Sequence, residues 1–74
     1  MMFPPKEIVE RIRQQFPSGC RIVLDAMNDA YRTIPAGTQG TVIAVDDIGT
    51  IHVSWDTGSS LGVVYGLDKI EKVQ

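Results

Sequence analysis

Residues 45–60 read VDDIGTIHVSWDTGSS, and apolar side chains alternate with polar ones through the middle of this stretch. The apolar side chains at every second position are Ile51, Val53 and Trp55. This period of two, with His52 and Ser54 in between, predicts a β-strand that buries one face. Aspartates precede Gly49 and Gly58 at the two ends, as is typical of tight turns. We therefore expect a strand flanked by two turns, with its apolar face in a core.

The rest of the chain supplies further strands and one helix. Short runs with apolar residues at alternate positions, bounded by turn-forming residues, predict strands at residues 20–27, 41–46, 60–66 and 70–73. Residues 28–40 are polar and rich in turn formers, so we expect a long loop there. Apolar side chains spaced as on one face of a helix predict an α-helix at residues 4–16. This stripe consists of Ile8, Val9, Ile12 and Phe16.

One helix followed by five short strands, with a long first connection between strands, is typical of a small SH3-like barrel. The chain has 74 residues, the length of one small domain. We therefore predict a single domain over residues 1–74 that is mainly β, with an N-terminal helix at 4–16 and a five-stranded barrel at 19–73. The helix stripe is expected to pack either on its own barrel or on a second copy of the chain, which leaves a homo-oligomer open.

Composition narrows the classes of function. The net charge is −2, which disfavours nucleic-acid binding because proteins of that class usually carry a basic face. Cys20 is the only cysteine and His52 the only histidine, so we expect neither an intrachain disulfide nor a zinc site. The unpaired thiol suits a reducing cytosol, and the sequence shows neither a signal peptide nor a membrane span. We expect a cytoplasmic protein without cofactor, metal or membrane contact.

A set of short motifs extends over most of the chain. They are GxRIxL at 19–24, MNDxY at 27–31, GTxGTV at 37–42 and VDDxGxIxVxWDxGS at 45–59. With these motifs, residues 16–71 resemble a family of small bacterial and phage proteins described as a domain of unknown function. That resemblance implies an accessory protein of a phage or other mobile element. A looser similarity to KOW and Mib/Herc2-type modules implies an SH3-like barrel that binds protein or nucleic acid and has no catalytic residue.

The aspartates and the histidine of residues 45–60 do not predict an active site or a metal site. Asp47 and Asp56 belong to turns at opposite ends of one strand, about 20–30 Å apart at the usual rise. Ser54 shares a strand face with His52, about 7 Å away, which is too far for direct proton transfer. We therefore predict no catalytic residue and no enzyme, and we expect the aspartates to shape the turns.

Aromatic side chains in and near the long loop predict a binding surface. In SH3-like barrels this loop lines the ligand groove, where aromatic residues supply rigid contact area. The candidate binding residues are Asn28, Asp29, Tyr31 and Arg32 in the loop, and Trp55 and Tyr65 at the edge of the sheet. Trp55 is also expected in the core because of its position in the strand. Arg21 and Arg32 are expected on one side, as a small cationic patch.

These observations predict a non-enzymatic binding or adaptor module that acts by protein–protein interaction. One alternative is nucleic-acid binding through a KOW-like barrel, which the acidic charge disfavours. A second alternative is the capture of a small ligand, such as a nucleotide signal, at an oligomer interface.

Overall fold

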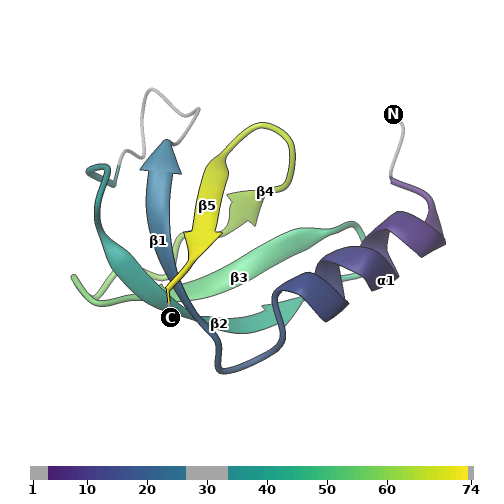
Figure 1. Ribbon diagram of the computed structural model, residues 1–74, viewed down its shortest axis with the longest axis horizontal. Helices are drawn as coiled ribbons and strands as arrows, with labels where there is room; N and C mark the ends of the chain where they lie inside the picture. The colour runs from purple at the N-terminus through teal and green to yellow at the C-terminus, as the bar shows by residue number, and fades with distance from the viewer. Residues whose placement is uncertain (1–3, 27–33, 74) are drawn as a thin grey trace.

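The computed structural model describes residues 4–26 and 34–73, and this part of the chain is built on one sheet. The elements in order are α1 (Lys6–Gln15), β1 (Arg21–Ala26), β2 (Gln39–Val45), β3 (Thr50–Trp55), β4 (Val63–Val64) and β5 (Lys69–Lys72) (Figure 1). The strands form an antiparallel sheet in the order β4-β3-β2-β1-β5, so the last strand pairs with the first. This arrangement confirms the predicted class, mainly β with five strands and one helix near the N-terminus.

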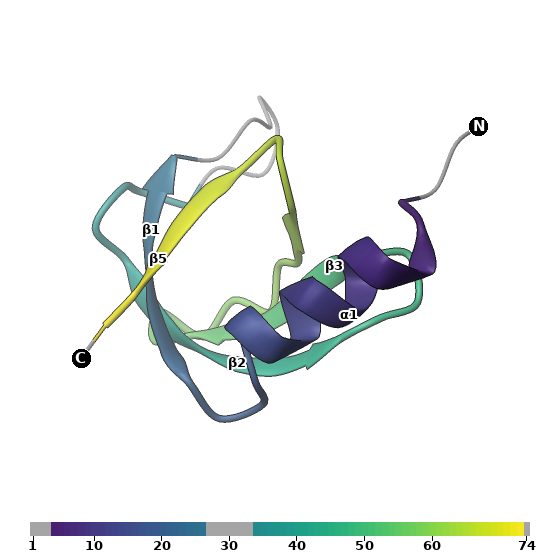
Figure 2. The same ribbon diagram turned by 45° about the vertical axis from the view of Figure 1, so that its right-hand side comes forward.

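The sheet is strongly curved, as Figure 2 shows, and its concave face holds the core. The buried apolar residues of the described chain are Val9, Ile12, Phe16, Ile22, Leu24, Ile34, Val42, Val45, Ile51, Val53, Trp55 and Val63. The inward face predicted for β3 is therefore confirmed at all three of its apolar positions. Full burial of a large apolar side chain contributes about 1.5–3 kcal/mol, so this cluster is the main source of stability.

α1 covers one end of the sheet with the apolar stripe that its sequence predicts. Val9 and Ile12 on the helix, and Phe16 just after it, are buried in the common core. Arg13 ties the helix to the sheet, because its Nε donates a hydrogen bond of 3.1 Å to the Val45 carbonyl oxygen. The stripe thus packs on the chain's own sheet. No helix of the described residues is long and apolar enough to cross a membrane.

The strand predicted at residues 60–66 is wrong for most of its length, because β4 has only two residues. The backbone N–H and the indole N–H of Trp55 donate to the carbonyl oxygens of Ser59 and Leu61, both at 2.8 Å. Since an indole takes the place of a backbone donor here, residues 60–62 form no ladder pair with β3 in the described part of the chain. The chain therefore runs beside β3 without continuing the sheet.

β2 begins at Gln39, two residues before its predicted start, and Gly40 allows this extension. Gly40 pairs with Trp55 of β3 at very close approach. A Cβ atom added at Gly40 would lie 2.7 Å from Val53 Cγ1 and 2.9 Å from Trp55 Cε3. The turn before the strand is formed instead by Gly37, whose φ of 91° favours glycine. Gly40 is therefore required by packing, whereas Gly37 is required by backbone conformation.

Candidate functional site

The six predicted binding residues have three different outcomes. Asn28, Asp29, Tyr31 and Arg32 lie outside the described residues. Trp55 is only 2% exposed, and its indole N–H is bonded to the Leu61 carbonyl oxygen. This burial confirms the predicted place of Trp55 in the core. Because a partner could not reach the buried ring, Trp55 is not part of an accessible binding edge. Tyr65 is 50% exposed and is accessible to a partner.

Arg21 does not supply a free cation for the predicted patch. Its two terminal nitrogens donate to the two carboxylate oxygens of Asp56, at 2.8 and 2.6 Å. These hydrogen bonds hold the pKa of the Asp56 carboxyl below its usual range. Arg13 is paired in the same way, with Asp47 at 2.9 Å and Glu10 at 2.7 Å. Both arginines therefore have carboxylate partners on the chain itself.

Asp46 shapes the turn between β2 and β3, as predicted, and also contacts the histidine. Its Oδ1 accepts hydrogen bonds from the backbone N–H groups of Ile48 (3.1 Å) and Thr50 (2.9 Å). Its Oδ2 lies 2.9 Å from Nε2 of His52. The alternation of residues does not predict this pair, because a β-bulge between Val42 and Ala44 turns Asp46 to the face of the sheet that carries His52. A bulge of this kind has no clear signal in the alternation of residues.

The contact with His52 helps to keep the Asp46 carboxyl ionised. Partial burial raises the pKa of Asp46, but hydrogen bonds from His52, Thr50 and Ile48 outweigh it and hold the pKa below its usual value. An ionised carboxylate only accepts hydrogen bonds, so Nε2 of His52 is the donor of this hydrogen bond. Within the described residues, no cluster of three His, Cys, Asp or Glu side chains is suited to hold a metal ion.

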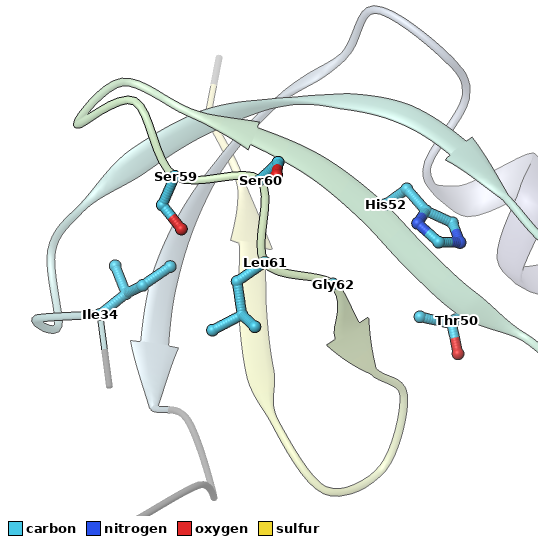
Figure 3. A pocket seen from close by; sticks show the side chains of 7 residues that line it. All are labelled: Ile34, Thr50, His52, Ser59, Ser60, Leu61 and Gly62. Atoms are coloured by element: carbon cyan, nitrogen blue, oxygen red, sulfur yellow. The ribbon is translucent and has the colours of Figure 1, made fainter. Parts of the chain in front are cut away.

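A hollow of about 560 Å³ opens beside this pair, where residues 60–62 leave β3. We call it the His52 groove; its lining residues are Ile34, Thr50, His52, Ser59, Ser60, Leu61 and Gly62 (Figure 3). Figure 3 shows Ile34 and Ser59 at one end of the groove, Ser60 and Leu61 in the middle, and His52 and Thr50 at the other end. The groove therefore combines the apolar side chains of Ile34 and Leu61 with the imidazole of His52 and with hydroxyl groups along its length.

A second, apolar groove of about 150 Å³ lies between the helix and the start of β3. We call it the Tyr65 groove; its lining residues are Pro4, Ile8, Ile12, Ile48, Gly49, Val64 and Tyr65. Ile48, Val64 and Tyr65 are 48%, 44% and 50% exposed. The sequence predicts only a turn at Ile48 and no part in a binding surface. Only the packing of the helix against this turn shows that its side chain belongs to an apolar surface.

The two grooves adjoin each other. Thr50 lines the His52 groove and pairs directly with Val64, which lines the Tyr65 groove. Directly paired residues of an antiparallel sheet place their side chains on the same face. The convex side of β3 and β4 thus carries a continuous surface, polar around His52 and apolar around Tyr65.

These features define a class of protein, a small antiparallel β domain with a helix packed at one end and two adjoining surface grooves. Residues 5–73 match the family model described as a domain of unknown function, DUF4314. The chain belongs to this family, which confirms the resemblance to a domain of unknown function seen in its sequence. No curated protein and no solved structure matches the chain at a significant level.

Proposed function

We propose that this protein is a non-enzymatic binding module that acts by protein–protein interaction through the Tyr65 groove. The observation that carries the proposal is the exposure of Ile48, Val64 and Tyr65 around one groove. Apolar side chains that gather on a surface, rimmed by polar residues, are typical of interaction sites. Tyrosine is also enriched at such sites, because it buries a large rigid ring and keeps a polar end.

We further propose that the module works in the cytoplasm as an accessory protein of a phage or other mobile element. The resemblance to small bacterial and phage proteins supports this setting. The unpaired Cys20 is compatible with a reducing compartment. A nucleic acid is a weaker candidate partner, because the chain has a net charge of −2 and proteins of that class usually carry a basic face.

Comparative affinity capture tests the proposal. The wild-type protein is compared with the double variant Ile48→Ser, Tyr65→Ser, which makes the Tyr65 groove polar. The matched control is Ile43→Ser, because Ile43 is 53% exposed but lines neither groove. All three substitutions lie at exposed positions, where changes in stability usually stay within about 0.5 kcal/mol. We expect a protein that is retained by the wild type and the control and lost by the double variant.

The interaction is then measured by calorimetry with the purified partner. Loss of an aromatic anchor at an interface costs about 2 kcal/mol or more, so we expect the dissociation constant to rise at least about 30-fold. A partner that binds the double variant and the wild type equally well would refute the site. Capture of nucleic acid alone, with an affinity that falls as salt rises, would refute the proposed class of partner.

A further inference from the structure

Another hollow, of about 380 Å³, adjoins the Tyr65 groove, because Tyr65 lines both. Phe16, just after α1, and the partly buried Ile70 of β5 supply apolar surface to this hollow. Its lining also includes three residues with carboxylates and one with an ammonium group, Asp25, Asp68, Glu71 and Lys69. We call it the acidic hollow. The Tyr65 groove and the acidic hollow thus combine apolar surface with an excess of negative charge.

Two carboxylates of the acidic hollow are accessible to a partner. Asp25 and Glu71 are exposed, and neither forms an ion pair within the described part of the chain. Asp68 is engaged on the chain itself, since its Oδ2 accepts a hydrogen bond of 3.0 Å from the Val64 backbone N–H. Lys69 is the one cationic side chain among the described lining residues, so carboxylates outnumber cations there. The acidic hollow therefore attracts a cationic group and disfavours an anionic one.

The sizes of the two hollows indicate which side chains they accept. The Tyr65 groove measures about 150 Å³, and a cavity of about that volume holds a benzene ring, so it accepts one apolar side chain. The larger acidic hollow accepts an arginine, whose methylene groups pack on apolar surface while its guanidinium pairs with carboxylates. Because both hollows adjoin Tyr65, one short segment can fill them together. Side chains two positions apart in an extended peptide lie on the same face, about 7 Å from each other.

We infer that the Tyr65 groove and the acidic hollow together bind an extended segment of a partner protein that carries an apolar residue and an arginine two positions apart. The apolar side chain occupies the Tyr65 groove. The arginine side chain enters the acidic hollow and pairs with Asp25 and Glu71. The inference rests on the proposed function, because it names the chemistry of the partner that the module holds.

NMR titrations of the ¹⁵N-labelled protein with acetyl-Leu-Gly-Arg-amide and acetyl-Arg-Gly-Leu-amide, one for each chain direction, test this inference. The salt concentration is about 0.15 M, where exposed charges more than about 8 Å apart are largely screened from each other. Ligands this short are expected to bind in the millimolar range. We expect the tighter of the two peptides to cause its largest chemical-shift changes at Ile48, Tyr65 and Ile70. Its analogues with glutamate in place of arginine, or glycine in place of leucine, are expected to bind at least about fivefold more weakly.

Two variants of the protein separate the acidic hollow from the net charge of the chain. The double variant Asp25→Asn, Glu71→Gln removes both accessible carboxylates and keeps the size of the side chains. Glu7→Gln is the control, because Glu7 is exposed and lies on α1 outside both hollows. We expect the double variant to bind the arginine and glutamate peptides within about twofold of each other, because the exposed ion pairs that set the preference are gone. Glu7→Gln is expected to keep the preference of the wild type.

Equal binding of the arginine and glutamate peptides, or of the leucine and glycine peptides, would overturn the inference. So would a charge preference that the double variant keeps, shift changes away from both hollows, or no shift change at the solubility limit of either arginine peptide. Shift changes at Ile48 and Tyr65 on dilution of the protein alone would identify a second copy of the chain as the occupant and would also overturn it. The titrations contain no partner protein, so they can fail while the capture experiment on the Tyr65 groove succeeds, and the reverse also holds.

Discussion

Gly40→Ala is expected to destabilise the protein strongly, because the space for a Cβ atom at this position is already filled. The added carbon would lie 2.7 Å from Val53 Cγ1, 2.9 Å from the Ser54 carbonyl oxygen and 2.9 Å from Trp55 Cε3. Two of these atoms belong to core side chains and the third to the backbone of the paired strand. Moving any of them would cost packing or hydrogen-bond energy. Forcing a carbon into a packed core costs about 1–3 kcal/mol, and the backbone contact puts the expected loss at about 2–3 kcal/mol.

Urea denaturation followed by the fluorescence of Trp55, the only tryptophan, measures this loss directly. At about 0.05–0.15 kcal/mol per residue the whole domain is stabilised by roughly 4–11 kcal/mol, so the change is large. The melting temperature should fall by about 10–20 °C. Gly62→Ala is the matched control, because its Cβ would lie 3.0 Å from the Thr50 methyl group, which can shift. A Gly40→Ala midpoint within 0.5 kcal/mol (about the scatter of surface changes) of the wild type would refute the packing argument.

Three further changes test other contacts. Trp55→Phe leaves the Leu61 carbonyl oxygen without its indole donor and should cost about 1–3 kcal/mol in thermal denaturation, whereas a loss below the error of the measurement would count against this bond. Ile12→Ala should cost about 2–5 kcal/mol, with an unfolding midpoint independent of protein concentration, because the helix packs on its own sheet; a midpoint that rises with concentration would contradict this. Asp46→Asn should reduce the loss of stability in acid. Burial raises the pKa of Asp46, but the hydrogen bonds that it accepts lower the pKa by more, so the folded-state pKa lies below the usual value of 3.8. The carboxylate therefore stabilises the wild type above pH 3.8, and this contribution is lost as the pH falls through the folded-state pKa. Urea midpoints measured from pH 6 to pH 2 check this, and parallel curves for the two proteins would exclude a role for the carboxylate.

The fold could be predicted from the sequence wherever burial alone sets the pattern. Alternation of apolar residues placed β3 and its inward face correctly, and the helical stripe placed α1. The prediction from sequence was wrong where a backbone carbonyl oxygen is bonded to a side chain and not to a neighbouring strand. The indole of Trp55 takes the Leu61 carbonyl oxygen, so residues predicted as a strand do not join the sheet. The pattern of residues 60–66 does not indicate this hydrogen bond, because its donor is a tryptophan five or more positions earlier in the chain.

The candidate site could be predicted only in part, and for a related reason. Tyr65 was named from the sequence, and it is exposed beside an apolar groove. Ile48 and the contact between Asp46 and His52 were missed. Ile48 becomes part of a surface only after the helix has packed against its turn, and the histidine meets the carboxylate only through a bulged register. Both depend on tertiary structure, which local sequence patterns do not carry.

Core and surface are coupled in this protein through one side chain. The ring of Trp55 is buried in the core, and its N–H donates a hydrogen bond of 2.8 Å to the Leu61 carbonyl oxygen. The same bond keeps residues 60–62 out of the ladder, and the His52 groove opens where the ladder is interrupted. A mutation that restored regular pairing along β4 would add backbone hydrogen bonds and close the groove. The short β4 is therefore the structural basis of the His52 groove.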